Sequence, residues 1–201
     1  MGKGKVDEEL KQFVLEEMDE REGKFSSKEE FEKQKEVMLK IFAEGKTPQE
    51  ATQLDDILLE SLYGFGYHLY NNGQYGKAIL LFRLLTTLNP NVSKYFLGLA
   101  ASLHLAEEYD SAIGIYTLVA GMEKESPIPY YHASDCYQKL ENSRSAWCMM
   151  KLAWARMGDN PKYKKLKART EILLDTLFAK AQKEGTSESK EKPREVKEAT
   201  P

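Results

Sequence analysis

Apolar and small residues along residues 59–160 follow one pattern that occurs three times. Three alanines spaced 34 residues apart mark its register: Ala78, Ala112 and Ala146. Each is followed four positions later by an aromatic or large apolar residue: Phe82, Tyr116 and Met150. A small residue on the preceding segment keeps the same interval: Gly66, Ala100 and Ser134. Because positions i and i+4 share one face of an α-helix, the pattern predicts pairs of packed helices.

A period of 34 residues is typical of tetratricopeptide repeats, in which each repeat is a helix–turn–helix unit. The small residue and the alanine of each repeat fall where two helices cross closely, since protein interiors are densely packed. Asn72-Gly73 predicts the turn of the first repeat, while Glu107-Glu108 and Glu141-Asn142 occupy that place in the others. The predicted fold is therefore all-α, a tetratricopeptide-repeat solenoid with repeats at residues 59–92, 93–126 and 127–160.

The segments that flank the repeats also carry helical patterns. Residues 6–22 have apolar positions at helical spacing, Ser27 with Glu30 forms a capping box, and Thr47-Pro48 begins another helix. We expect residues 1–58 to form N-terminal helices that cover the first repeat or a second copy of the chain, since solenoid ends need covering. Residues 161–183 are predicted to form a C-terminal capping helix and residues 184–201 a disordered tail.

Three tyrosines form the most informative stripe in the chain. Tyr63, Tyr67 and Tyr70 lie at i, i+4 and i+7 of the first predicted repeat helix, so they share one face. The packing side of this helix is expected to hold other residues: Leu58, Leu62, Phe65, Gly66 and Leu69. Core packing is the alternative for the tyrosines, but their hydroxyls favour a wet edge.

First helices line the concave surface of tetratricopeptide repeats, so the tyrosine stripe is expected to face a groove. The equivalent positions of the second and third repeats extend this predicted groove: Leu97, Ala101, His104, Tyr131, Asp135 and Gln138. The groove so predicted is aromatic and apolar and has few charges.

Charge is spread unevenly along the chain and excludes some classes of partner. Residues 1–56 carry 10 basic and 16 acidic residues, residues 57–160 carry 8 and 9, and residues 161–201 carry 11 and 7. The repeats thus have no basic stripe that would follow a nucleic-acid backbone. No apolar run is long enough for a transmembrane helix, and no secretory signal peptide is visible. Cys136 and Cys148 are expected to be buried, reduced thiols in the cytosol.

No residue pattern indicates catalysis, a cofactor or a metal site. His104 and His132 have no partners at metal-ligand spacing, so structural roles are expected for their rings. Asp55-Asp56 is interpreted as a helix start that favours the helix dipole. Phosphate loops, nucleophile elbows and zinc-protease motifs are absent from the sequence. The sequence therefore predicts a protein that is not an enzyme.

Leu54 to Trp147 resembles the class II chaperones of bacterial type III secretion, the low-calcium-response protein H family. The most specific match is the run Tyr95-Phe96-Leu97-Gly98-Leu99-Ala100. Other matches are partly general to the repeat: Leu62-Tyr63, Tyr67, Tyr70, Gly73-Gln74-Tyr75, Tyr109-Asp110-Ser111-Ala112-Ile113 and Tyr131-His132-Ala133. The resemblance covers about half of the chain.

The resemblance implies a chaperone of the bacterial cytoplasm that binds hydrophobic translocator proteins and keeps them soluble and competent for secretion. An extended translocator segment would lie in the groove. Binding roles follow for Tyr63, Tyr67, Tyr70, Leu97, Tyr131 and Asp135, and homodimerisation for the helices before residue 58. The first predicted helix and the charged tail exceed the usual length of the family.

Other functions stay open at this point. A co-chaperone that grips an acidic C-terminus needs Lys, Asn and Arg on the groove helices, and this chain has Tyr, Leu, Ala and Asp there. A tetratricopeptide scaffold or adaptor remains an alternative, including one that partners a transcription activator.

Overall fold

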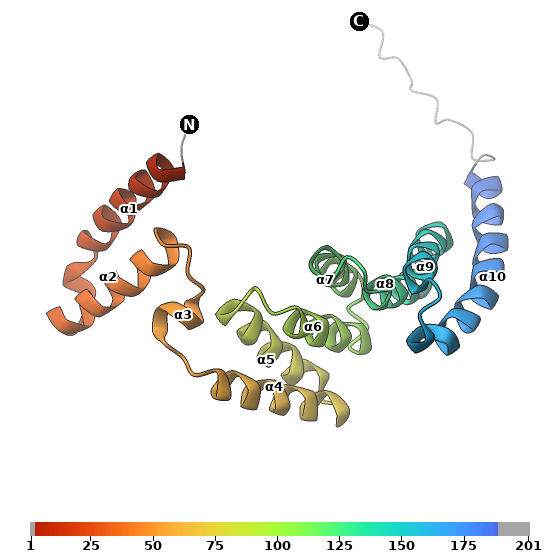
Figure 1. Ribbon diagram of the computed structural model, residues 1–201, viewed down its shortest axis with the longest axis horizontal. Coiled ribbons are helices and arrows are strands. Elements are labelled where there is room, and N and C mark those ends of the chain that lie inside the picture. Colours follow the sequence, from red (N-terminus) through yellow and green to blue (C-terminus); the bar gives the residue numbers. More distant parts are fainter. Residues whose placement is uncertain (1–2, 189–201) are drawn as a thin grey trace, which may run out of the picture. The chain divides into compact units, whose positions relative to one another are not determined.

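The computed structural model describes residues 3–188, and these residues form two units divided between Tyr95 and Phe96. Each unit is described by itself. The described residues form helices in a repeat arrangement, as predicted (Figure 1). The first unit holds α1 (Lys3–Asp19), η1 (Glu22–Lys24), α2 (Lys28–Phe42), α3 (Pro48–Thr52), α4 (Asp56–Asn71) and α5 (Tyr75–Leu88). The division falls within α6 (Ser93–Leu105), and the second unit continues with α7 (Tyr109–Met122), α8 (Ile128–Lys139), α9 (Ser143–Met157), η2 (Pro161–Tyr163) and α10 (Lys164–Glu188).

The N-terminal helices pack first on one another. Val14 and Met18 of α1 form a small core with Phe31 of α2. The Ser27 hydroxyl accepts a hydrogen bond from the Glu30 amide, but the Glu30 carboxylate accepts from the amide of Ser26. The predicted capping box of α2 is therefore only half formed.

The short helix α3 joins this N-terminal hairpin to the first repeat. Thr47 caps its start and Pro48 lies in the first turn, as predicted, and Glu50 completes a capping box with Thr47. Gln49 is buried, donates to the Asp56 carboxylate and accepts from Asn89 Nδ2 at 2.6 Å. This side chain links α3 to the start of α4 and to the end of α5.

Close helix crossings within the repeats explain the small residues of the 34-residue pattern. A Cβ atom at Gly66 would lie 3.1 Å from Cζ of Phe82, so glycine admits the aromatic ring of α5 against α4. Ala100 and Ala112 are fully buried in the second repeat. In the third repeat, Ser134 Oγ donates to the Ala146 carbonyl oxygen at 2.7 Å, which satisfies its buried hydroxyl.

One turn conformation recurs in all three repeats. Gly73, Glu107 and Glu141 are spaced 34 residues apart and have φ values of +72°, +63° and +57°. Each lies at a helix C-terminus where the following amide reaches back to close the last turn, as Gln74 N does to Leu69 O at 2.9 Å. The repeat geometry thus imposes a left-handed backbone on two glutamates, which costs more than it does for glycine.

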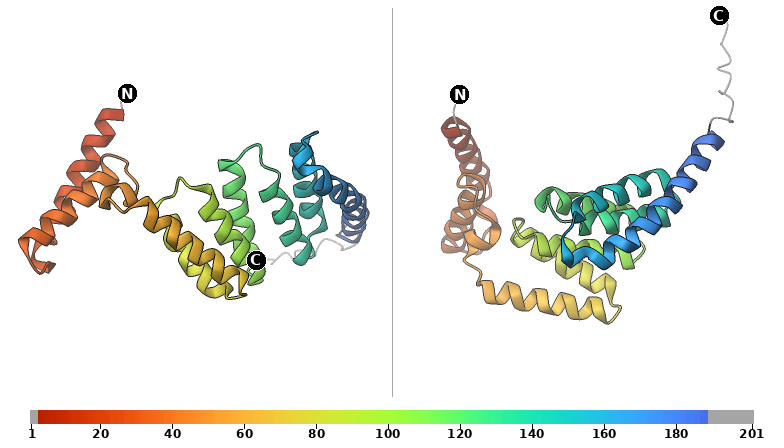
Figure 2. Two further views of the ribbon diagram at one scale, coloured as in Figure 1. Left: turned by 60° about the horizontal axis from the view of Figure 1, so that its bottom comes forward. Right: turned by 45° about the vertical axis from the view of Figure 1, so that its right-hand side comes forward.

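The C-terminal helix covers the last repeat. Leu177 of α10 packs with Ala146 and Met150 of α9, and the two helices run side by side (Figure 2). The helix continues to Glu188, beyond the predicted end at 183. Residues 189–201 of the predicted disordered tail lie outside the described residues. Among the helices of the described part, none combines the length and the apolar character that crossing a membrane requires.

One expectation for α4 is wrong. Leu58 and Phe65 were expected on its packing side, but both side chains are exposed, whereas Leu59, Gly66 and Leu69 are buried. The buried apolar residues of α1 and α2, Val14, Met18 and Phe31, form a core of their own and do not cover this flank of the first repeat.

Candidate functional site

The tyrosine stripe of the first unit forms a connected row of aromatic rings on α4. Tyr63 is half-buried, with its ring centroid 5.9 Å from that of Phe82 and 5.8 Å from that of Tyr95. Tyr67 and Tyr70 stack at 6.3 Å, and Tyr70 meets the edge of Tyr75 at 5.9 Å. Tyr67 is 54 % exposed and is the member of the stripe most open to a partner.

Lys94, which is paired with a carboxylate, lies at the edge of the tyrosine stripe. Lys94 Nζ lies 4.8 Å from the centre of the Tyr63 ring and forms an ion pair with Glu60. The hydrogen bond that Lys94 donates to the Glu60 carboxylate raises the pKa of Lys94. Positions 60 and 94 are equivalent in the first and second repeats, so this pair joins the first helices of two consecutive repeats.

The second unit brings the other predicted groove residues onto the facing helices α6 and α8. Their side chains are all partly exposed: Leu97, Ala101, His104, Tyr131 and Asp135. We call this set the α6–α8 face. His104 Nε2 lies 3.0 Å from Asp135 Oδ2 and ties α6 to α8. That hydrogen bond lowers the pKa of Asp135, so its carboxyl group is ionised at neutral pH.

A histidine beside this pair is held by aromatic rings. His132 stacks on Tyr116 with a centroid separation of 5.5 Å, and His104 meets the edges of Tyr109 and Tyr116. Burial, and then the nearby His104, lower the pKa of His132. The ring is therefore neutral at pH 7, in agreement with its predicted structural role.

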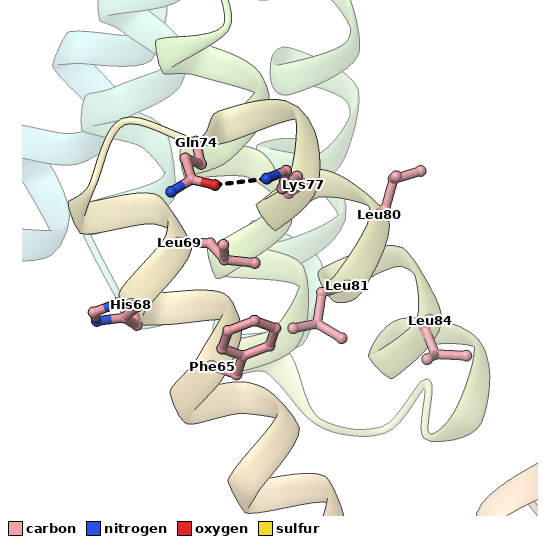
Figure 3. Close-up of a pocket in the computed structure, with 8 residues that line it drawn as sticks. All are labelled: Phe65, His68, Leu69, Gln74, Lys77, Leu80, Leu81 and Leu84. Atoms are coloured by element: carbon pink, nitrogen blue, oxygen red, sulfur yellow. Dashed lines mark hydrogen bonds between the residues drawn. The ribbon is translucent and has the colours of Figure 1, made fainter.

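The first unit has a second surface that was not recognised from the sequence. Leu58, Phe65, Leu80 and Leu84 form an exposed apolar face on α4 and α5, with Phe65 56 % and Leu80 67 % exposed. All but Leu58 line an open pocket of about 570 Å³ with Leu69 and Leu81 (Figure 3). Lys77 donates to Gln74 at 2.9 Å at its rim. We call this surface the α4–α5 apolar face.

A sequence signal for this face does exist. Leu80 has Gly114 and Cys148 at the equivalent positions of the other repeats, so a large apolar residue occurs there only in the first repeat. The N-terminal hairpin has an exposed apolar patch as well, where Phe13 and Phe42 border a pocket of about 290 Å³.

Comparison with known proteins places these surfaces in context. A tetratricopeptide-repeat family model matches residues 59–91, within the first repeat. The low calcium response locus protein H of Yersinia pseudotuberculosis is 29 % identical over 140 residues, which cover 70 % of this chain and 83 % of the relative.

Solved structures extend the likeness. SycD of Yersinia enterocolitica, crystallised with a peptide of the translocator YopD, is 29 % identical with a TM-score of 0.61 over 63 % of this chain and 97 % of that one. The same chaperone is also known as an alternative dimer. PcrH bound to the chaperone binding region of PopB is 30 % identical with a TM-score of 0.58, over 60 % of this chain and 98 % of PcrH.

This chain belongs to the class II chaperones of type III secretion. Both matched structures are covered over nearly all of their own length, but they match only about three fifths of this class II chaperone. Its relatives are named as chaperones and not as enzymes.

The two cysteines of this class II chaperone differ. Cys136 is buried, and burial raises the pKa of its thiol to about 12, so it stays protonated. Cys148 is exposed, so the expectation that both thiols are buried is wrong for Cys148. The Cys148 side chain lies on the side of α9 away from the core that Ala146 and Met150 form with α10. Within residues 3–188, no group of His, Cys, Asp and Glu side chains could hold a metal ion.

Proposed function

We propose that this chain binds hydrophobic translocator proteins of a bacterial type III secretion system in the cytoplasm and keeps them soluble and secretion-competent. The observation that carries the proposal is its 30 % identity to nearly the whole of PcrH, which was crystallised with a translocator's chaperone-binding region. The role is non-catalytic, since binding and release of an unfolded segment require no covalent step.

The tyrosine stripe is the proposed contact in the first unit. Tyr67 has the largest exposed area of the three, and the stacked Tyr70 holds it in place. An apolar client side chain can pack on these rings while the hydroxyls stay in water, which suits tyrosine at interfaces. Burial raises the pKa of Tyr70, so its hydroxyl stays neutral beside such a client.

The α6–α8 face is the proposed contact in the second unit. Leu97, Ala101 and Tyr131 offer apolar area, and the His104–Asp135 pair sets the position of the two helices that carry them. In this unit the client segment would lie extended along α6 and α8, with its side chains between these residues.

We further propose that the chain forms a homodimer through the N-terminal helices together with the α4–α5 apolar face. Residues 1–56 carry a net charge of −6, whereas Lys77 lies at the rim of the pocket on α4 and α5. Each surface has large apolar side chains that are exposed within its own chain. Phe13 and Phe42 of one copy would fill the apolar face of the other.

Two substitutions test the tyrosine stripe and the α4–α5 apolar face independently. Tyr67→Ala removes the exposed ring of the stripe, whereas Leu80→Glu places a charge on the α4–α5 apolar face without opening a core. Tyr63 is not a suitable target, because its ring packs on Phe82 and Tyr95. Each variant is co-expressed with the translocators of the same secretion system, and helicity is checked by circular dichroism.

The expected results are opposite for the two variants. Tyr67→Ala weakens client capture by a factor of about 30, equivalent to about 2 kcal/mol for an aromatic anchor, and leaves the dimer intact. Leu80→Glu yields a folded monomer in sedimentation experiments and still captures the client. Capture by folded Tyr67→Ala at the wild-type level would contradict the groove, and absence of any captured translocator would favour a scaffold or an adaptor of a transcription activator.

A further inference from the structure

The second unit places one carboxylate, that of Asp135, among the residues of the α6–α8 face. Asp135 lies on α8 with its side chain 46 % exposed. Ala101 holds the equivalent position on α6, and Tyr131 lies one helical turn before Asp135 on α8. A partly desolvated carboxylate gains more from a cationic partner than one in open water does.

The position of this carboxylate is set from the opposite helix. His104 binds oxygen Oδ2 at 3.0 Å, so the side chain is held in one orientation before any partner arrives. Lys139 acts on Asp135 through space from the next turn of α8, and His104 and His132 are the other charged or titratable groups close to it. Among these groups, only His104 is bonded to the carboxylate.

Aromatic rings in this chain repeatedly hold cations. Lys94 Nζ lies 4.8 Å from the centre of the Tyr63 ring, and the Arg156 guanidinium lies 4.0 Å from that of Tyr130. Tyr131 and Asp135 share one face of α8 at i and i+4. A cation beside Asp135 would therefore meet a carboxylate together with an aromatic ring, a combination that favours Lys or Arg.

We propose that Asp135, held by His104, is a specificity-determining residue that takes a lysine or arginine side chain of the client segment. The corresponding edge of the first unit carries Lys94, which already pairs with Glu60. A basic client residue is therefore favoured at the second unit and not at the first. This inference rests on the proposed function and adds the charge of the ligand to it.

The test uses the full chain and short overlapping synthetic peptides that cover the hydrophobic translocators of the same secretion system. Binding is measured by calorimetry for the wild type, Asp135→Asn and Asp175→Asn. Asparagine keeps the size of the side chain and an oxygen that can accept from His104, but removes the charge. Asp175 is an exposed carboxylate on α10, so its variant makes the same charge change outside the site. Each binding peptide is also made with its basic residues replaced by glutamine.

Binding affinity is expected to depend on the Asp135 carboxylate only when the peptide carries its basic residue. Asp135→Asn weakens binding of the basic peptide by about tenfold or more, as for a charge-assisted hydrogen bond. It leaves the glutamine peptide unchanged, and Asp175→Asn changes neither peptide. The inference is overturned if Asp135→Asn binds the basic peptide like the wild type, or if it weakens both peptides equally. If no peptide binds the folded wild type, the proposed function itself fails, and the inference fails with it.

Discussion

The first and second units place different chemistry on equivalent repeat positions. Positions 67 and 70 of the first unit are stacked tyrosines, whereas the equivalent positions 101 and 104 of the second unit are alanine and a histidine bonded to Asp135. The alanines that set the register are fully buried in both. Buried register positions therefore maintain the repeat, while exposed positions between them are free to determine what each unit binds.

The largest expected loss of stability comes from a substitution in the core beneath the tyrosine stripe, and it tests whether the stripe depends on that core. Phe82 is almost fully buried, and its ring contacts Tyr63. Phe82→Ala is expected to destabilise the first unit by about 3–5 kcal/mol, because it removes a large buried ring and leaves a cavity. Hydrogen exchange of α4 and α5 measures this loss. Unchanged protection there, with wild-type client capture, would show that the stripe is independent of this core.

A smaller loss of stability is expected from substitutions at the small residue of the repeat, which is Gly66 in the first repeat and Ser134 in the third. Gly66→Ala brings a Cβ atom to 3.1 Å from the Phe82 ring, so the ring has to shift. We expect a loss of about 1–3 kcal/mol in urea unfolding, as for other overpacked cores. Ser134→Ala places the same residue at the equivalent position of the third repeat and is expected to cost less, since it keeps the Cβ atom and removes only one buried hydrogen bond. Equal losses would contradict the role assigned to glycine.

Acid is expected to destabilise the second unit through His132. The pKa of His132 is lowered by burial and by His104, while Asp135 acts in the opposite direction. The folded state therefore favours the neutral ring, so stability is complete above the ordinary histidine pKa of about 6.5 and falls as pH drops below it. Both tryptophans of the chain, Trp147 and Trp154, lie in the second unit, so their fluorescence in urea reports on that unit.

His132→Phe serves as the control, because it keeps the ring stacked on Tyr116 and cannot be protonated. Its stability is expected to change less between pH 7 and pH 5 than that of the wild type. A wild-type midpoint that does not change over this range would contradict the assignment.

The smallest effect concerns the repeated turn. Glu107→Gly and Glu141→Gly are each expected to stabilise the second unit by about 1 kcal/mol, because glycine adopts a positive φ without the steric cost of a Cβ atom. Gly73→Ala is the reverse change in the first unit and is expected to destabilise it by a similar amount. Thermal unfolding measures all three. Lower melting temperatures of the glutamate-to-glycine variants would contradict this prediction. They would show that the glutamate side chains stabilise the second unit by more than their backbone strain destabilises it.

Much of the fold could be predicted because its signals are local in the sequence. The 34-residue spacing of Ala78, Ala112 and Ala146 reflects three similar helix pairs, and Thr47 followed by Pro48 marks the start of α3. The tyrosine stripe could be predicted for the same reason, since helical spacing alone places Tyr63, Tyr67 and Tyr70 on one face. Their proposed contact with a client stays a prediction.

The sequence by itself therefore determined the repeat, its register and the composition of each helix face. Only the tertiary structure decided which of those faces is covered. Phe65 was expected on the packing side of its helix, yet its side chain is exposed. The His104–Asp135 bond likewise required α6 and α8 to be placed side by side. Helical periodicity is a property of neighbouring residues, whereas burial and cross-helix bonds depend on segments that are distant along the chain.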